Sequence, residues 1–553
     1  MSNQKKQWGA IIVMIALFAM IAFVTNLCSP MATIIKAQGN IPEVLAQIGN
    51  YGNFVAYLVM GIPAGMLIAK FGYKKTALIG LAVGIAGILI QWFSGTLDAK
   101  ENLGLVFGVY LAGAFIAGLC MCILNCVVNP MLNILGGGGN SGNQLIQIGG
   151  VFNSTAAVAV YILMGALIGE ITKKTAIADA TPALMIALGI FVVAFVVILF
   201  TKIEEPEQSP VDMSLVKGAL KYRHFTLGIL AIFLYMGIEV GVPTYILQYL
   251  SSDTKEVIEK KCAVMEKYEA GTINADQAAL EIIACTQTTN IDSVRMQGEK
   301  KAFIEFIKKA DAEVAEKLEA SDMSADMAIN EYEALRDSFV YAGGEEAVKD
   351  FHELIADTKE KIAPTEAGKE PEITLASLKE TVPGQGMSAG IVGLIVAVYW
   401  LMMLVGRFVG GAIGSKVSSR VMITTVSVAT IVLVLFGMFA PATSVNVPGI
   451  DWANMKLITA EVPMGIFAFL LVGLCTSVMW GGIFNMAVEG LGKYTAVASG
   501  IFMTMVFGCA VMVALQALVA GFAVDYMTSY WVVVFCAAYL LFYALVGSKP
   551  VKK

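Results

Sequence analysis

One stretch of this chain decides its fold class: residues 224–250 read HFTLGILAIFLYMGIEVGVPTYILQYL. It exceeds the roughly 20 apolar residues that an α-helix needs to cross a bilayer. Glu239 interrupts it near the middle. A charge at the membrane centre is disfavoured by roughly 2.5–3.5 kcal/mol on insertion scales, and such residues usually mark an ion, proton or substrate site. Glu239 is therefore the leading candidate for a functional residue.

Apolar runs of this kind recur along the whole chain. Of its 553 residues, 57% are hydrophobic and 14% are charged, whereas about a quarter are charged in soluble domains. The runs lie near residues 9–35, 45–69, 76–96, 103–135, 145–170, 180–201, 224–250, 388–415, 421–440, 461–488, 495–523 and 529–547. We therefore predict an all-α membrane protein with twelve transmembrane helices in two six-helix bundles.

The basic residues indicate the orientation of these helices, since cytoplasmic loops are enriched in Lys and Arg. With the N-terminus inside, internal segments hold Lys70, Lys75, Arg223, Lys416 and Lys553, among others, and the short external loops hold few. The distribution predicts a multi-pass protein of a bacterial inner (plasma) membrane with both termini in the cytoplasm.

The chain divides at a linker and at one long polar block. We expect an N-terminal six-helix bundle (1–203), a cytoplasmic linker (204–223), helix seven (224–250), an acidic extracytoplasmic insertion (251–386) and helices eight to twelve (387–553). Apolar residues repeat at three and four spacing within the insertion, which predicts amphipathic helices. The insertion is either a helical cap that gates the outer mouth or a solvated segment without a direct role.

Cysteine and histidine usage excludes several kinds of site. Cys262 and Cys285 lie in the external insertion and could close a disulfide in an oxidising compartment. The other seven cysteines lie in apolar helices, where Cys acts as a small hydrophobe. No zinc-ligand spacing, phosphate-binding loop or nucleophile–base arrangement occurs, so we expect no metal centre, no cofactor and no enzymatic activity.

The two halves repeat a glycine-rich motif that leads into a basic turn. Small residues four apart let membrane helices approach closely. The basic turns would sit on the cytoplasmic surface, either as part of a gate between the halves or as plain positive-inside anchors. The gating candidates are Gly65, Gly72, Lys74, Lys75 and Arg407.

Several local motifs occur in the order found in one transporter family. They are Pro63-Ala64-Gly65, Asn129-Pro130, Phe152-Asn153-Ser154, Tyr235-Met236-Gly237-Ile238-Glu239, Gly406-Arg407-Phe408 and Ile483-Phe484. Together they resemble the fucose-proton symporter (sugar permease) branch of the major facilitator superfamily, over nearly all the chain except the insertion. The resemblance implies a secondary active transporter that takes up a monosaccharide such as fucose, glucose or galactose by alternating access.

The coupling residue departs from that family's pattern. Known fucose symporters use acids in helices one and four, where this chain has Ser29 and Asn125. No other Asp or Glu lies deep in a predicted helix, so Glu239 is predicted to bind the coupling ion. Burial favours the neutral form of a carboxyl, so a proton could gate movement; sodium on the same carboxylate is the rival. A buried acid satisfied by Tyr or Asn partners, with no transport role, is the third possibility.

Sugar binding needs flat apolar surfaces together with amides or hydroxyls that pair with the ring of OH groups. Candidate polar side chains are Asn26, Asn53, Asn125, Asn129, Gln147, Asn153, Gln248 and Asn485, and candidate stacking surfaces are Tyr235, Tyr245, Tyr399, Trp400 and Trp480. Asn129 and Asn153 match family positions. Each amide could instead bond a neighbouring helix. Pro130 leaves the carbonyl of Cys126 without its helical donor, which predicts a kink in helix four.

Two other functions fit the same sequence. One is a sodium-coupled carrier of a sugar or another polar metabolite, and the other is a transport-inactive membrane sensor. The expected partners are a small polar solute, a proton or sodium ion and membrane lipid, without nucleic acid, and the protein is expected to be a monomer.

Overall fold

The computed structural model describes most of the chain. The described residues are 7–38, 43–97, 99–168, 181–201, 213–285, 355–356, 358–365, 371–387, 389–441, 443–451 and 456–549. Within them, the side chains of 25–38, 43–54, 99–103, 158, 160–168, 213–214, 284, 389–390, 448–451 and 456–458 lie outside the description. Within these ranges, nine helices are long and apolar enough to cross a membrane. The chain is an integral membrane protein, as predicted.

Five helices form what we call the N-terminal group: α1 (Trp8–Gln38), α2 (Glu43–Ser94), α3 (Ala99–Leu135), α4 (Gly139–Ile168) and α5 (Thr181–Phe200). α2 packs against α3 and α5, and α1 packs against α3 and α4. α2 kinks at Gly72, where φ is 81° and ψ is 175°. Essentially only glycine adopts that region. The kink divides one apolar stretch where the sequence predicts a break between two helices.

The remaining membrane helices form the C-terminal group, which follows the short helix α6 (Met213–Leu220). Its members are α7 (Arg223–Ser251), α14 (Ala389–Ile413), α15 (Ser419–Phe439), α16 (Met464–Thr476), α17 (Met479–Val488), η3 (Gly492–Tyr494), α18 (Thr495–Thr504), η4 (Met505–Phe507), α19 (Gly508–Ala523), α20 (Tyr526–Ser529), α21 (Trp531–Phe542) and η5 (Tyr543–Gly547). α7 packs against α14, α16, α17, α19 and α21. α7 is therefore central to this group.

The predicted helix 461–488 is broken, and so is the predicted helix 495–523. The first divides into α16 and α17 around Ser477 and Val478, and the second divides into α18, η4 and α19. Apolar length alone predicted continuous helices. The break exposes backbone groups near the middle of the bundle, where they become available to other helices.

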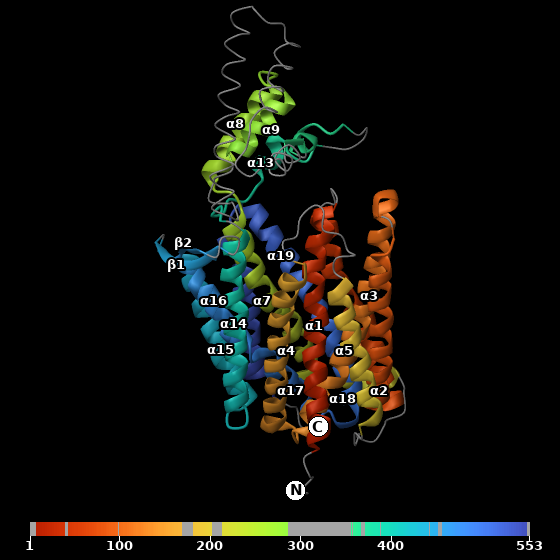
Figure 1. The fold of residues 1–553 in the computed structure, drawn as a ribbon. Helices are drawn as coiled ribbons and strands as arrows, with labels where there is room; N and C mark the ends of the chain where they lie inside the picture. Colours follow the sequence, from red (N-terminus) through yellow and green to blue (C-terminus); the bar gives the residue numbers. More distant parts are fainter. Residues whose placement is uncertain are drawn as a thin grey trace, which may run out of the picture.

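The insertion between α7 and α14 begins with helices and stands on the end of α7 (Figure 1). α8 (Lys255–Glu269), α9 (Ala275–Cys285) and α13 (Leu375–Lys379) lie in its described part. They share a separate apolar core that includes Val264, Ile282 and Ile362. Residues 299–309, where apolar residues of the insertion repeat at three and four spacing, lie outside the described residues. The described part is helical, in agreement with the periodicity of the sequence.

One β-hairpin departs from the all-α prediction. β1 (Ser444–Asp451) pairs antiparallel with β2 (Lys456–Pro463) between α15 and α16. Val445 pairs with Val462, and Val447 pairs with Ala460. Valine favours strands, but apolar length alone predicted only the transmembrane helices on either side of this segment.

The two helix groups meet toward one end of the molecule. We call it the terminal side, because α1 begins and η5 ends there, opposite the insertion (Figure 1). The described contacts between the groups include those of α2 with α18 and η4, of α3 with α18, and of α4 with α14 and α17. Gly65 packs on α18, where an added Cβ would lie 3.0 Å from the carbonyl oxygen of Ala496 and 3.2 Å from the Cα of Gly500.

Candidate functional site

Glu239 lies in the middle of α7, facing the contact between the helix groups. Its side chain is 13% exposed. Pro243 follows one turn later and has no amide hydrogen to donate to the carbonyl of Glu239. The hydroxyl of Tyr399 on α14 donates to that carbonyl instead, at 3.2 Å. The sequence Glu-Val-Gly-Val-Pro thus ties α7 to α14 at the acid.

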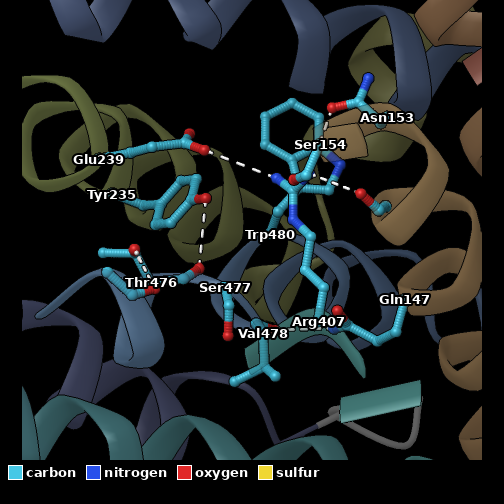
Figure 2. Close-up of polar contacts among 12 residues, drawn as sticks. Gln147, Asn153, Ser154, Tyr235, Glu239, Arg407, Thr476, Ser477, Val478 and Trp480 are labelled. Carbon is cyan, nitrogen blue, oxygen red and sulfur yellow. Dashed lines mark hydrogen bonds and ion pairs between the residues drawn. The ribbon is translucent and has the colours of Figure 1, made fainter. Parts of the chain in front are cut away.

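Arg407 of α14 is the charged partner of Glu239. Its Nη2 lies 3.7 Å from Oε1 of Glu239, and its side chain is only 11% exposed. A carboxylate removed from water needs such a partner, because an isolated buried charge is very costly. Figure 2 shows the guanidinium between Glu239 on one side and α4 on the other. The intramembrane acid is thus part of an ion pair.

The same guanidinium reaches across to the N-terminal group. Nη1 of Arg407 donates to the carbonyl of Gly150 at 2.8 Å, to Oδ1 of Asn153 at 3.2 Å and to Oγ of Ser154 at 2.6 Å. Asn153 itself donates from Nδ2 to the carbonyl of Phe18 at 2.8 Å. Arg407 therefore bridges α7 and α4, which belong to different groups (Figure 2).

Arg407, one of the gating candidates, lies within α14 and is largely buried. The glycine beside it explains how this position is reached. A Cβ on Gly406 would overlap Oγ of Ser477 and lie 2.7 Å from the carbonyl of Leu474. Glycine therefore lets α16 approach α14 closely while Arg407 extends toward α4.

The break between α16 and α17 supplies acceptors to both groups. Tyr235 of α7 donates its hydroxyl to the carbonyl of Thr476 at 3.4 Å. Gln147 of α4 donates Nε2 to the carbonyl of Val478 at 3.1 Å. Thr476 also shares a hydrogen bond with the hydroxyl of Tyr399 at 3.3 Å. The broken helix thus joins the surroundings of Glu239 to α4.

A buried polar cluster connects α3 to the C-terminal group. Asn129 is fully buried, and its Oδ1 accepts from Nε1 of Trp480 at 3.1 Å. Its Nδ2 donates to the carbonyl of Asn125 at 3.0 Å, and Asn125 donates to the hydroxyl of Tyr57 at 2.6 Å. The Trp480 ring lies 6.2 Å from that of Tyr235. Asn125, Asn129, Trp480 and Tyr235 are thus brought together, next to the ion pair.

Pro130 has the consequence that the sequence predicts for Cys126. The carbonyl of Cys126 lacks its helical donor. It accepts a hydrogen bond from Oγ of Ser499 on α18 at 3.3 Å. A proline in one helix group therefore creates an acceptor that the other group uses.

The chain resembles curated sugar transporters. It is 27% identical over 259 residues to a protein from Brucella abortus named glucose/galactose transporter, covering 46% of this chain and 61% of the relative. It is 24% identical over 277 residues to the L-fucose-proton symporter of Haemophilus influenzae, covering 44% and 62%. The chain thus spans about six tenths of these relatives' lengths. No family profile matches it.

The structure resembles crystal structures of one symporter over almost its whole length. The Escherichia coli fucose:proton symporter FucP superposes with a TM-score of 0.61 and 16% identity, covering 98% of both chains. FucP in the outward conformation, described as a major facilitator superfamily transporter, gives the same values. The chain has the major facilitator fold. The predicted resemblance to the fucose-proton symporter branch is confirmed, and the curated relatives are named as transporters, not enzymes.

Other predicted residues lie nearer the terminal side. Asn485 of α17 accepts at Oδ1 from Asn133 at 2.8 Å and donates to Oγ of Ser419 at 2.9 Å. Gln144, which the sequence analysis did not select, donates to the carbonyl of Gly411 at 2.9 Å. Gln144 and Gln147 lie three residues apart on α4, and Gly150 follows at the same spacing. The two amide side chains and the carbonyl of Gly150 all bond the C-terminal group.

Three predicted sugar-binding residues lie apart from this cluster. Tyr245 is buried within the C-terminal group, where its hydroxyl donates to the carbonyl of Val513 at 3.2 Å. Gln248 lies near the C-terminal end of α7, where its carbonyl accepts from the backbone amide of Ser252. Trp400 is 37% exposed, and its ring packs edge-on against Tyr399. One residue along a helix turns a side chain by about 100°, so Trp400 faces outward when Tyr399 faces inward. The side chains of Asn26 and Asn53 lie outside the described residues.

The basic turn of α2 makes contacts within its own group, and the predicted cysteine pair is not bonded. Lys74 donates from Nζ to the carbonyls of Leu199 and Thr201 at 3.0 and 2.8 Å, and so caps the end of α5 within its own group. Lys75 is exposed. The structure forms no disulfide between Cys262 and Cys285, so the predicted bond is absent from it. Cys262 lies on α8 and Cys285 ends α9, the next helix of the insertion.

Proposed function

We propose that this chain is a secondary active transporter that takes up a monosaccharide together with a proton by alternating access. Glu239 is the proton-binding group. One observation carries the proposal: a largely buried carboxylate meets a buried arginine at the contact between the two helix groups. Intramembrane ionisable residues in such positions mark proton and substrate pathways.

The ion pair favours a proton over sodium. Nη2 of Arg407 already lies 3.7 Å from the carboxylate of Glu239. A sodium ion at Glu239 would be repelled by that guanidinium, and like charges about 4 Å apart repel strongly in a low-dielectric site. A proton neutralises the carboxylate without adding a second cation beside Arg407.

The substrate assignment rests on the relatives and on the polar cluster. The relatives are named for glucose, galactose and L-fucose. Asn125, Asn129, Gln147, Tyr235 and Trp480 combine amides with aromatic faces within one region of the structure. We assign these residues to sugar binding, in the conformation that separates Asn129 from Trp480.

The organisation that goes with this function is the one the sequence predicts. Twelve spans form bundles from 1–203 and from 224–250 with 387–553, joined by the cytoplasmic linker 204–223. Both termini lie in the cytoplasm of a bacterial cell, and the acidic segment 251–386 lies outside the inner membrane. Gly65, Gly72, Lys74 and Lys75 belong to the inner gate. The protein works as a monomer.

Uptake into proteoliposomes tests the proposal. The panel is radiolabelled fucose, glucose and galactose, under an imposed pH gradient or an imposed sodium gradient. We expect accumulation of one or more sugars with the pH gradient alone. Glu239→Gln should abolish accumulation and retain exchange of sugar across the membrane, because the variant mimics the protonated state permanently.

The matched control is Glu489→Gln. Glu489 is another glutamate of the C-terminal group paired with an arginine, Arg420, but its side chain is 57% exposed. The Glu489→Gln protein should accumulate sugar as the unmodified protein does. Full accumulation by Glu239→Gln would remove this residue from coupling, accumulation driven by sodium alone would replace the proton, and no uptake of any sugar would overturn the substrate class.

A further inference from the structure

The guanidinium of Arg407 occupies an unusual position among the contacts between the helix groups. The other described hydrogen bonds between the groups use neutral side chains or backbone, such as Gln144, Gln147 and Trp480. Arg407 is the charged donor among these described bonds, and it makes three contacts with α4. The stability of these hydrogen bonds between Arg407 and α4 therefore depends on whether a negative charge compensates the guanidinium.

The negative charge that compensates Arg407 comes from Glu239, which belongs to the same helix group. Glu239 and Arg407 both belong to the C-terminal group, and their ion pair does not itself join the two groups. The acceptors that Arg407 finds on α4 are the neutral Gly150, Asn153 and Ser154. When Glu239 is ionised, the pair is neutral overall and can stay buried. When Glu239 binds a proton, a buried positive charge is left with neutral partners.

We propose that Arg407 is the positioning residue that converts protonation of Glu239 into release of α4 from α14. Removing one partner of a buried pair strongly destabilises the other charge where it stands. Arg407 then moves toward water, and its three contacts with α4 are lost. The terminal side opens as a result. This inference rests on the proposed role of Glu239 as the proton acceptor.

Among the titratable side chains around Glu239, only Arg407 has described contacts with α4. The titratable side chains that face it are Tyr235 on α7, Arg407 and Tyr399 on α14, and Cys509 on α19. Tyr235 and Tyr399 already bond elements of the C-terminal group, through Thr476 and the carbonyl of Glu239. Of these four, Arg407 is the one whose described contacts also reach α4.

The geometry also requires arginine at this position. One nitrogen of the guanidinium serves α4 and the other serves Glu239, a division that the planar fork makes possible. A lysine keeps the positive charge but places its donors on a single nitrogen. Arg407→Lys should therefore weaken the connection between proton binding and the contact with α4, although the net charge is unchanged.

A distance measurement tests the inference without any sugar. Nitroxide labels replace Lys75 after the kink of α2 and Lys416 after α14, two exposed positions on the terminal side. Cys262 and Cys285 are changed to Ser so that they do not take up label. Pulsed electron spin resonance on the full chain in nanodiscs gives the ratio of long to short distances at high and low pH.

We expect low pH and Glu239→Gln each to raise that ratio about tenfold, within the usual range of coupling between sites. Arg407→Lys should raise it at high pH and reduce its pH dependence. The double variant should show no more than the larger single effect, because the two residues act as one unit. Ser154→Ala, which removes the shortest contact without changing a charge, should shift the ratio in the same direction by less.

The controls are Glu489→Gln and Arg420→Lys, which alter an ion pair within the C-terminal group. Neither should move the ratio. The inference is overturned if Arg407→Lys behaves as the unmodified protein at both pH values, or if its effect and that of Glu239→Gln multiply. A distance response without sugar uptake would support the role of Arg407 and contradict the proposed sugar substrate. Proton-driven sugar uptake without a distance response would support the proposed function and contradict the role of Arg407.

Discussion

The close contact between α2 and α18 predicts the effect of adding one methyl group at Gly500, and the distances give the size of that effect. A Cβ on Gly500 would overlap the carbonyl oxygen of Gly61 and lie 2.9 Å from the Cα and the nitrogen of Gly65. These are backbone atoms, so they cannot rotate away. Gly500→Ala should therefore force α18 from α2, at a cost of about 1–3 kcal/mol for overpacking.

The cost falls on only one conformation. Alanine stabilises a helix by about 0.5–1 kcal/mol relative to glycine whether the groups are together or apart. Only the closed terminal side suffers the clash. A difference of 1–3 kcal/mol shifts the ratio of open to closed molecules by roughly 5- to 150-fold. Gly500→Ala should thus fold well and still favour the open terminal side.

The nitroxide pair at positions 75 and 416 measures this ratio, and the melting temperature in detergent reports on folding. Gly521→Ala is the matched control, since a Cβ there meets nothing within 4 Å. It should leave the ratio unchanged. A Gly500→Ala protein whose distances equal those of the control would refute the packing argument, and so would one that simply melts earlier without a change in distance.

Three further outcomes follow from single positions. Gly72→Ala should lower the free energy of unfolding by about 1–3 kcal/mol, because its φ of 81° with ψ of 175° suits only glycine; Gly189→Ala, with nothing within 4 Å, is the control in thermal melts. Trp480→Phe should destabilise the closed state by about 1–3 kcal/mol, since the fully buried Asn129 loses the donor to its Oδ1; unchanged label distances would contradict this. Burial raises the pKa of the Cys262 thiol above its usual value, so a smaller fraction of Cys262 than of a cysteine peptide is thiolate at pH 8. Maleimide should therefore label Cys262 more slowly than the peptide, and the labelling rate should still rise with pH above about 9. Resistance to labelling until a reductant is added would instead indicate a disulfide.

The sequence predicted those parts of the site that depend on one helix. An acid in an apolar run identified Glu239, because transferring a charge into a membrane is costly wherever the chain folds. Asn129-Pro130 predicted a free carbonyl at Cys126, because a proline lacks its amide hydrogen in any helix. The donor that satisfies this carbonyl, Ser499, lies 373 residues away and could not be read from the motif.

The sequence by itself determined a helical membrane protein, its family resemblance and its leading acid, since hydrophobic length and intramembrane charge are local properties of the chain. Tertiary structure alone decided that Arg407 pairs with Glu239 and reaches α4, and that Trp400 packs against Tyr399 with its ring partly exposed. The physical reason is that a charge stays buried between helices only where partners from other helices compensate it, and the sequence does not show which residues those partners are. Glu239, Arg407 and Ser154 come from three helices and meet only when the two groups pack together.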